Sequence, residues 1–475
     1  MNKLLVKMAI LSISLLTVMA SAAVSPALAK IRQAFPAADI TLIKLVLTLP
    51  SLLIIPFSLL SGVLAARMRK KNVLLIGLVI YFLGGIGGGF AQNITQLLII
   101  RGLFGIGVGL IIPLSTSLIA DFYEGAERTK VMGLSGSVSH MGGVIFLLLS
   151  GWLACMSWRY AFGVYALSLL TAIMLLIWLP EPVSKKPGGM VKSKLPGGVY
   201  WCAVLGALMM VAFYAAPTNL AMFIENERKL YSSETPLFQN REELLMHLKK
   251  GTVSETARRS FKNNGIILSE KASLSLLEQG KAWKIMDGNK KLLVRKEGDK
   301  LIVSSERLGR PGIAGYFLST MTLIGVGSGI ILATLLKIFG PFCPAVGIAS
   351  MAVGYLALVY TSSLSWVFAA MVCIGFSSGV LMPLLLLKTA KLAPETSRAF
   401  AMAVVSIGVY LGQFLSPVIL KFAGTFFGND VFKSQFIFLA MGLGIATFIG
   451  IFSALKTVKQ GGFNSDLAGK GISHH

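Results

Sequence analysis

The sequence is short of acidic residues and of charge in general. Of its 475 residues only 20 are Asp or Glu, and the four charged residue types together make up 13%. Its four cysteines are scattered, without the spacing of a metal site or of a disulfide framework. It also lacks the glycine-rich loop, ending in Lys and Ser or Thr, that cradles nucleotide phosphates. We therefore expect no metal, no cofactor and no ATP-driven mechanism, and nothing in the chain indicates an enzyme.

Apolar side chains dominate the sequence instead. Hydrophobic residues make up 55% of the chain and the mean hydropathy is +0.76, far above the needs of a soluble core. Lipid offers no partner to an unpaired backbone group, and the alternation of barrel strands is absent, so we predict an all-α integral membrane protein with twelve transmembrane helices. The predicted spans are residues 5–29, 42–66, 72–92, 97–121, 130–153, 158–179, 198–224, 313–338, 341–362, 364–390, 397–424 and 434–456.

A repeated pattern divides these spans into two halves. Seven residues recur at one constant offset, and each copy starts in one span and continues into the next. Parallel repeats with a substrate path at their interface are typical of secondary transporters. We therefore predict two pseudo-symmetric six-helix bundles. The repeated residues are Gly105, Gly109, Pro113, Ala120, Arg128, Met132 and Gly142, matched by Gly375, Gly379, Pro383, Ala390, Arg398, Met402 and Gly412.

A polar block interrupts the second half. It holds 18 Lys and Arg against 11 Asp and Glu and contains no possible span, so we predict a small domain inserted between the seventh and eighth spans. The predicted divisions are 1–182 for the first bundle, 183–197 for a cytoplasmic linker, 198–225 for the seventh span, 226–311 for the insertion, 312–458 for the rest of the second bundle and 459–475 for a cytoplasmic tail.

The insertion is predicted to be a small α+β domain. Capping residues indicate helices over 241–250, 254–262 and 269–279, and a hairpin is predicted from 290–296 and 300–304. Three helices and a basic hairpin resemble a winged-helix outline, which would indicate DNA binding. The domain is expected outside the cytoplasm, where DNA is absent, so we predict no nucleic-acid partner. It is either an addition that transport does not require or the working part of a receptor or scaffold.

Basic residues are distributed unevenly between the two ends of the spans. Outside the insertion, 19 fall on one side and 6 on the other. The positive-inside rule then places both termini in the cytoplasm of a bacterial-type inner membrane. This topology, with attraction to anionic lipids of the bilayer, explains much of the net charge of +24. A signal peptide cleaved near residues 20–23 is the alternative, and it would leave eleven spans.

A recognisable motif follows the second span. Gly62, Arg67 and Lys71 fit the pattern Gly, any, Leu, Ala, Asp, Arg, any, Gly, Arg, Lys, although Ala66 stands at its Asp position. With twelve spans in two halves and a long central loop, the chain resembles the major facilitator superfamily of secondary transporters. The resemblance implies a cytoplasmic gate, in which Asp121 is available to pair with Arg67. The gating residues expected are Gly62, Arg67, Lys71, Asp121, Arg128 and Arg398.

The fourth span carries an Arg inside the membrane. Arg101 followed by Gly105 and Gly109 matches a family motif that the resemblance links to proton coupling in exporters. A buried Arg is costly in lipid and is therefore functional or firmly paired, and an Arg that only locks helices together is the alternative. The second half has no equivalent of Arg101. Small residues and prolines expected to pack helices are Gly105, Gly109, Pro113, Gly375, Gly379 and Pro383.

Few other polar residues lie within the spans. The fifth span lacks the Gly and Pro of the antiporter signature, with Phe146 and Leu147 in the counted positions, which weakens a drug and proton antiport assignment. His140 titrates near neutral pH and is a candidate proton carrier, or else a histidine satisfied at a helix interface. The candidate coupling and substrate-path residues are Arg101, His140, Tyr214, Thr218, Asn219 and Gln413, although such residues more commonly bond neighbouring helices.

These features together predict a monomeric secondary active transporter of a small organic molecule, working by rocking of its two halves. Proton-coupled export is the favoured mechanism, and a proton-coupled or facilitated uptake permease is the alternative. No carboxylate is predicted well inside a span, which favours a neutral, amphipathic or anionic substrate. A receptor or scaffold acting through the insertion is the alternative of another class.

Overall fold

The structure is a computed structural model of the chain. It describes residues 3–17, 22–181, 195–226, 235–237, 273–277, 282–287, 290–297, 300–307, 310–361, 363–394, 397–423 and 431–459. Most of the predicted linker and tail, and the helices expected over 241–250 and 254–262, lie outside these residues. The chain forms two compact units, of which the larger contains the apolar helices and the smaller lies mainly in 224–310.

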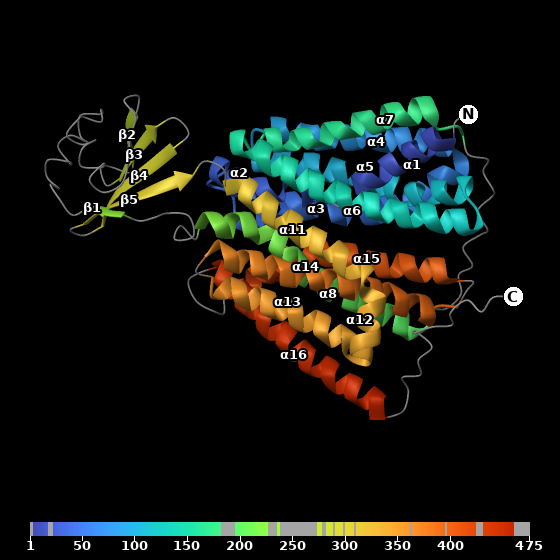
Figure 1. Ribbon diagram of the computed structural model, residues 1–475. Coiled ribbons are helices and arrows are strands. Elements are labelled where there is room, and N and C mark those ends of the chain that lie inside the picture. The colour runs from blue at the N-terminus through green and yellow to red at the C-terminus, as the bar shows by residue number, and fades with distance from the viewer. Residues whose placement is uncertain are drawn as a thin grey trace. The chain divides into compact units, whose positions relative to one another are not determined.

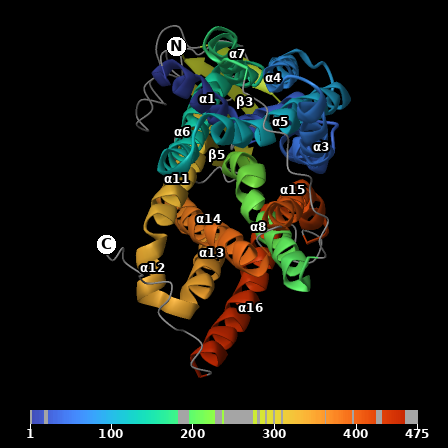
Figure 2. The same cartoon turned by 90° about the vertical axis from the view of Figure 1, so that its right-hand side faces the viewer.

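Eleven helical stretches in the described residues are long and apolar enough to cross a membrane, and they correspond to the second to twelfth predicted spans. Figures 1 and 2 show them in two bundles, one ending with α7 and one beginning with α8. The first contains α1 (Lys3–Thr17), η1 (Ala22–Ala27), α2 (Leu28–Ala34), α3 (Ile40–Arg67), α4 (Lys70–Gly87), η2 (Gly88–Phe90), α5 (Ile94–Phe122), α6 (Gly125–Met156), η3 (Tyr160–Ala166) and α7 (Leu167–Trp178). The second contains α8 (Gly197–Asn226), α11 (Arg310–Ile330), α12 (Leu332–Phe339), η6 (Gly340–Phe342), α13 (Cys343–Val359), α14 (Leu364–Leu392), α15 (Arg398–Ala423) and α16 (Val431–Lys459).

The first predicted span, residues 5–29, differs from the others because its described residues fall into three separate helical pieces, α1, η1 and α2. α1 is a 15-residue apolar helix, and the described chain resumes with η1 and α2. Pro26 lies inside η1, where an α-helix would need the amide hydrogen that proline lacks. Both α1 and η1 pack along α6, so these pieces line the bundle beside the eleven longer helices.

Polar caps fix where two central helices begin. The Asp39 side chain accepts a hydrogen bond from Thr41 N at 2.7 Å and starts α3, and Asn93 accepts one from Gln96 N at 2.8 Å and starts α5. Such caps satisfy amide groups that the first turn of a helix leaves unpaired. The two helices so begun, α3 and α5, pack side by side.

Glycines allow α5 to lie directly on α3. A Cβ atom on Gly105 would lie only 2.6 Å from the carbonyl oxygen of Pro50, and one on Gly109 would lie 3.0 Å from that of Ile54. A larger residue at either position would therefore push the two backbones apart. Small residues commonly allow such close approach between helices in membranes.

The second half uses the repeated glycines in the same way. A Cβ on Gly375 of α14 would overlap the carbonyl oxygen of Met321 in α11, and one on Gly379 would overlap that of Gly325. α14 therefore lies on α11 as α5 lies on α3, which is the relation that the internal repeat requires.

The last pair of repeated glycines extends the correspondence to the fifth and eleventh spans. Gly142 of α6 lies against the backbone of Leu15 in α1, and Gly412 of α15 lies against that of Ala207 in α8. The repeated glycines thus stand at equivalent helix contacts in both bundles.

The smaller unit contains a five-stranded antiparallel sheet with the strand order β1-β5-β4-β3-β2. The predicted hairpin is present as β4 and β5, but the helix predicted over 269–279 is wrong, because β2 occupies part of it. Ser and Leu alternate from Ser273 to Leu276, and this period of two favours a strand. The strands are β1 (Thr235–Leu237), β2 (Ser273–Leu277), β3 (Ala282–Asp287), β4 (Lys290–Glu297) and β5 (Lys300–Arg307).

Candidate functional site

The two bundles are joined where α3 begins, which we call the Asp39 end. Asp39 forms an ion pair with Lys421 of α15, with Oδ2 and Nζ 3.1 Å apart. Hydrogen bonds from Thr41 and then from Lys421 hold the pKa of Asp39 below its usual value. Further along α3, Ser51 Oγ donates to Gln413 Oε1 of α15 at 2.9 Å. α3 therefore contacts the second bundle along the first half of its length.

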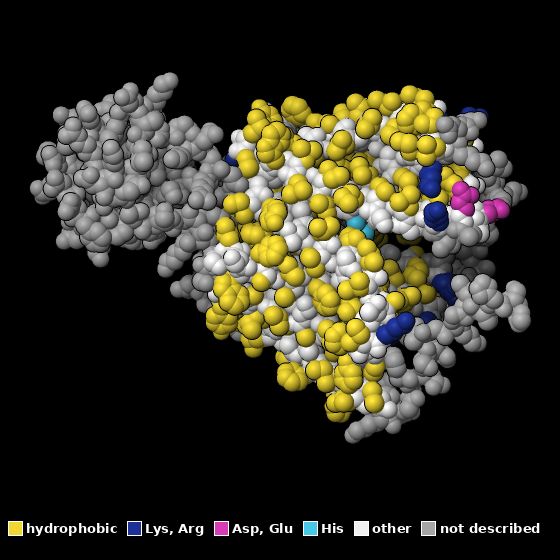
Figure 3. Space-filling view, viewed as in Figure 1, with side chains coloured by type: hydrophobic (Ala, Val, Ile, Leu, Met, Phe, Trp, Pro, Cys, Tyr) yellow, Lys and Arg dark blue, Asp and Glu magenta, His cyan; other side chains and the backbone are white. Residues whose placement is uncertain are grey.

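A second contact between the bundles lies at the same end. The close approach of Gly151 in α6 to the backbone of Pro311 and Gly315 brings α6 against the beginning of α11. One helical turn deeper, Ser319 Oγ donates to Val144 O at 3.2 Å. In Figure 3 the surface between the bundles is hollowed on the right-hand side of the view. The described contacts thus close the Asp39 end.

Lys44 is the buried cation of this closed end. It is 1% exposed, and its Nζ donates to Gln435 Oε1 of α16 at 3.0 Å. The ammonium also lies 5.6 Å from the centre of the Phe432 ring. A lysine near the end of a predicted span ordinarily reaches the membrane surface, so the burial of Lys44 was not predicted. A signal was present, because Lys44, Thr48 and Ser51 form a polar stripe with helical spacing on an otherwise apolar segment.

Arg101 is completely buried inside the first bundle. Its Nε donates to Val46 O of α3 at 2.9 Å, and Nη1 donates to the Tyr165 hydroxyl at 3.2 Å. The guanidinium carbon lies 4.3 Å from the centre of the Phe104 ring, a distance at which a cation is attracted to the ring face. The side chain therefore joins three elements of one bundle.

Pro50 explains why the Val46 carbonyl is available. In a regular helix the carbonyl of residue 46 accepts from the amide of residue 50, but proline has no amide hydrogen. The Nε of Arg101 supplies the missing donor. This arrangement fits the interpretation of Arg101 as a firmly held residue.

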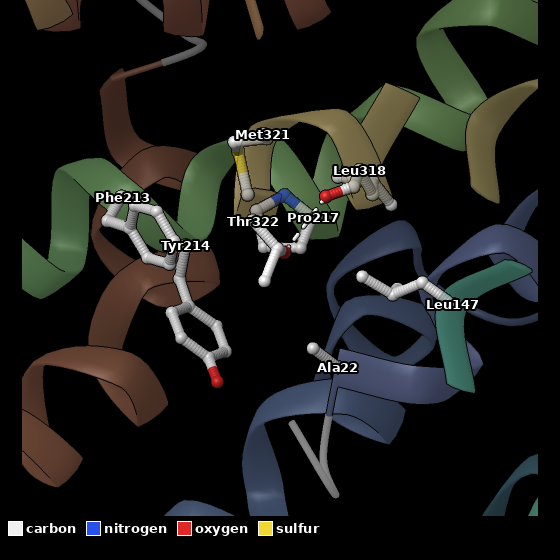
Figure 4. Close-up of a pocket in the computed structure, with 8 residues that line it drawn as sticks. All are labelled: Ala22, Leu147, Phe213, Tyr214, Pro217, Leu318, Met321 and Thr322. Carbon is white, nitrogen blue, oxygen red and sulfur yellow. Dashed lines mark hydrogen bonds between the residues drawn. The ribbon is translucent and has the colours of Figure 1, made fainter. Parts of the chain in front are cut away.

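A small pocket lies between the bundles (Figure 4). It measures about 10 Å³, roughly the room for one water molecule. Tyr214 points across the pocket toward the segment that carries Ala22. The lining comes from η1 and α6 of the first bundle and from α8 and α11 of the second, and comprises Ala22, Leu147, Phe213, Tyr214, Pro217, Leu318, Met321 and Thr322.

The candidate substrate-path residues of α8 and α15 separate into two groups. Tyr214 lines the pocket, and Gln413 lies in the closed contact with α3. The hydroxyl of Thr218 instead donates to Tyr214 O at 2.7 Å, within its own helix. Asn219 Nδ2 donates to Ala215 O at 2.9 Å, whereas its buried Oδ1 accepts no hydrogen bond from the described residues. Only Tyr214 and Gln413 therefore stand between the bundles in the described contacts.

His140 lies on the face of α6 that turns toward the second bundle. It precedes Val144, Leu147 and Gly151 by four, seven and eleven residues, and these spacings keep all four on one helix face. His140 is half-buried, and none of the described residues forms a hydrogen bond with it. The hydroxyl of the neighbouring Ser139 donates to Ser14 O at 2.7 Å.

At the opposite end, Asp121 pairs with Lys70 and not with Arg67. The Nζ of Lys70 lies 2.6 Å from Asp121 Oδ2, and it also donates to Ser117 at 2.9 Å. Ser117 and Asp121 are one turn apart at the end of α5, where Lys70 opens α4, whereas Arg67 is exposed at the end of α3. The expected pairing of Asp121 with Arg67 is therefore wrong, and the neighbouring basic residue of the motif takes its place.

The remaining predicted gating residues are spread over this end. Lys71 donates to the carbonyls of Leu176 and Leu179 at the end of α7. Arg128 and Arg398 are exposed at the beginning of α6 and of α15, and Gly62 lies in α3 with open space where a Cβ would be. In the described contacts this set is dispersed, whereas the Asp39 end is closed.

The sequence matches the Major Facilitator Superfamily over residues 10–240 and 301–417. One relative is the multidrug transporter protein MdtP of Bacillus subtilis, 33% identical over 103 residues, which are 22% of this chain and 19% of that protein. Another is the multidrug efflux pump SdrM of Staphylococcus aureus, 28% identical over 179 residues, 38% of this chain and 40% of that protein. The chain therefore matches less than half the length of either relative.

Solved structures of transporters share the fold. The nucleoside transporter NupG has a TM-score of 0.63 at 10% identity, covering 96% of this chain and 100% of its own. The xylose transporter XylE of E. coli, in an inward open conformation, has a TM-score of 0.60 at 14% identity, covering 94% of each chain. The family match covers well over half of this chain, its helices form the expected two bundles, and the protein belongs to the Major Facilitator Superfamily, a family of transporters and not of enzymes.

Proposed function

We propose that the protein is a monomeric secondary active transporter that exports a small organic molecule in exchange for protons by alternating access. The named activities of MdtP and SdrM, multidrug transport and efflux, support export of this kind. The observation that carries the proposal is the one-ended closure of the two bundles. α3 and α6 contact the second bundle near the Asp39 end, and a pocket lined by both bundles lies next to these contacts.

The Asp39 end is the outer end in this proposal. Exposed basic residues stand at the opposite end in both bundles, including Arg67 at the end of α3, Arg69 just after it, and Lys388 and Lys391 near the end of α14. Most of the basic side chains on the face shown in Figure 3 lie toward one end, on the right-hand side of the view. Cytoplasmic loops are the ones enriched in Lys and Arg, which supports cytoplasmic termini and an outer side that is closed in this structure.

Proton coupling is assigned to the first bundle. Arg101 holds a fixed positive charge among Val46, Phe104 and Tyr165, and His140 faces the second bundle from α6. A histidine changes charge between about pH 5 and 8 and is therefore suited to take a proton on one side of the membrane and to release it on the other. We assign His140 as the carrier and Arg101 as a residue that tunes it.

The charges of the membrane part favour an uncharged, amphipathic or anionic substrate. Within the described helices, Asp and Glu stand only near helix ends, whereas Arg101 and Lys44 are fully buried cations. A cationic substrate would meet positive charge without a buried carboxylate to compensate it. Tyr214 and Gln413 are the hydrogen-bonding groups that we place on the substrate path.

Inverted membrane vesicles test the direction of transport. Vesicles that contain the full chain are energised and exposed to a panel of fluorescent aromatic compounds of different charge. Export predicts uptake into inverted vesicles that collapses when the pH gradient is dissipated. Accumulation only in right-side-out vesicles would show an uptake permease instead.

A further inference from the structure

The contact between Lys44 and Gln435 buries a lysine side chain in the closed Asp39 end, which is called the gate below. We propose that Lys44 is a positioning residue of the transport cycle: its charge makes the closed Asp39 end less stable and so keeps the gate able to reopen. The inference rests on the rocking of the two bundles proposed above. It concerns the balance between two conformations and does not depend on the substrate.

The described surroundings of Lys44 hold fewer acceptors than an ammonium group can use. The group has three hydrogens to donate, and among the described residues it donates one hydrogen bond, to the neutral Gln435. Phe432 offers a ring face at 5.6 Å. In the described part of the chain no carboxylate forms an ion pair with Lys44, since Asp39, which caps α3, accepts hydrogen bonds from Thr41 and Lys421.

When the Asp39 end closes, the Lys44 ammonium therefore loses its contacts with water. In their place it gains only the neutral Gln435 acceptor and the Phe432 ring among the described residues. Burial of a charge without a charged partner is unfavourable, and a charge within a membrane helix is costly. When the bundles separate at this end, water reaches Lys44 again. The charge of Lys44 thus favours the open gate. The hydrogen bond to Gln435 reduces the cost of burying that charge when the gate is closed.

This account predicts opposite effects for the two partners of one hydrogen bond. Lys44→Met keeps an apolar side chain of similar length and removes the buried charge, so the closed gate becomes more stable. Gln435→Leu leaves the ammonium buried without its acceptor, so the closed gate becomes less stable. A hydrogen bond that simply stabilised the closed gate would behave differently, because the loss of either partner would then favour the open gate.

The distance between the first turn of α3 and the last turn of α15 reports the state of the gate. Spin labels are placed at Leu42 and Phe422, which are both exposed, in the full chain with its four native cysteines replaced by serine. Pulsed electron spin resonance then gives the populations of short and long distances. We expect the ratio of open to closed gate to fall about tenfold in Lys44→Met and to rise about tenfold in Gln435→Leu, each equivalent to about 1.4 kcal/mol.

Two further variants separate charge from the loss of a contact. In the double variant the effect of Gln435→Leu should largely disappear, since no ammonium remains to be left unpaired. Ser51→Ala is the neutral control, because it removes the hydrogen bond to Gln413 across the same interface without removing a charge. It should leave the ratio unchanged or move it toward the open gate.

The outcomes distinguish this inference from the proposed function. If wild type shows both distances and the two single variants shift the ratio in the same direction, the inference is overturned while rocking stands. A shift of Ser51→Ala toward the closed gate equal to that of Lys44→Met also overturns it, since charge would not be the cause. A single distance in wild type under all conditions, with and without a pH gradient, removes the rocking and the inference together.

Discussion

Arg101 donates a hydrogen bond to the carbonyl of Val46, which has no helical donor because Pro50 follows four residues later. The bond links α5 to α3 at the level of the Gly105 contact, so the charge, the proline and the glycine form one packing unit. Its position explains how a fully buried Arg is tolerated in a membrane helix. The arrangement also suggests how a locking role can be separated from a coupling role.

Substitutions of Arg101 by Gln and by Lys separate these roles. Gln retains a neutral donor near Val46 and removes the charge, whereas Lys retains the charge and loses the planar fork of donors. We expect Arg101→Gln to stay folded but to lose the dependence of flux on the pH gradient, and Arg101→Lys to keep part of it. Flux in proteoliposomes and thermal unfolding of the same preparations check this. If Arg101→Gln retained gradient-driven flux in full, Arg101 would serve only to hold the helices together.

The glycine contacts predict a selective loss of stability. Gly105→Ala places a methyl group against the backbone of Pro50, which cannot move without separating α3 from α5, so we expect a loss of about 1–3 kcal/mol. Gly375→Ala should behave alike in the second bundle. Gly133 of α6 has open space at its Cβ position, and Gly133→Ala should be neutral or slightly stabilising. Unfolding of the purified variants in detergent measures the difference, and equal effects at all three sites would contradict these contacts.

The ion pair of Asp39 and Lys421 should contribute little to the stability of the closed gate. That contribution should not change with pH near neutrality. The pKa of Asp39 is lowered, so its contribution is present above its ordinary value of 3.8 and is lost only as pH falls through the lower value of the folded protein. Both side chains are about half exposed, so the open-to-closed ratio should change only a few-fold at most in Asp39→Asn. The spin-label distance between pH 5 and 8 checks this, and a steep change there would contradict it.

The same position offers a matched pair of variants. Asn is a good helix cap, so Asp39→Asn keeps the cap of α3 and removes the ion pair, whereas Asp39→Ala removes both. Asp39→Ala should therefore cost about 1 kcal/mol more in thermal unfolding. Equal stabilities would show that the cap is not needed to start α3.

The smaller unit should be dispensable for transport. The family match leaves out residues 241–300, and the smaller unit lies mainly in 224–310. Deletion of 228–305 joins the flanks through a short loop, and we expect its flux to remain close to that of wild type. Vesicle flux and a binding assay for extracytoplasmic partners check this. Loss of transport in a correctly inserted deletion variant would make the unit part of the transport machinery.

The sequence predicted the membrane architecture well where it depends on composition and repetition. Apolar length located the second to twelfth spans, and the glycine repeat located equivalent helix contacts, because both depend on local chemistry. The helix expected over 269–279 was wrong, because a capping signal at its start was given more weight than the alternation of Ser and Leu that follows. The pairing of Asp121 depended on which of several neighbouring basic residues lies across from α5, and spacing alone does not decide that. Lys44 was missed because a lysine near a span end ordinarily reaches the membrane surface.

Flux driven by a proton gradient tests the central claim most directly. The full chain is reconstituted in proteoliposomes, a pH gradient is imposed, and movement of a transported compound is compared between wild type, Arg101→Ala and His140→Ala. We predict gradient-driven flux in wild type, loss of it in both variants, and retained downhill exchange in His140→Ala. Normal flux in both variants, with no effect of the pH gradient on wild type, would contradict the proton mechanism.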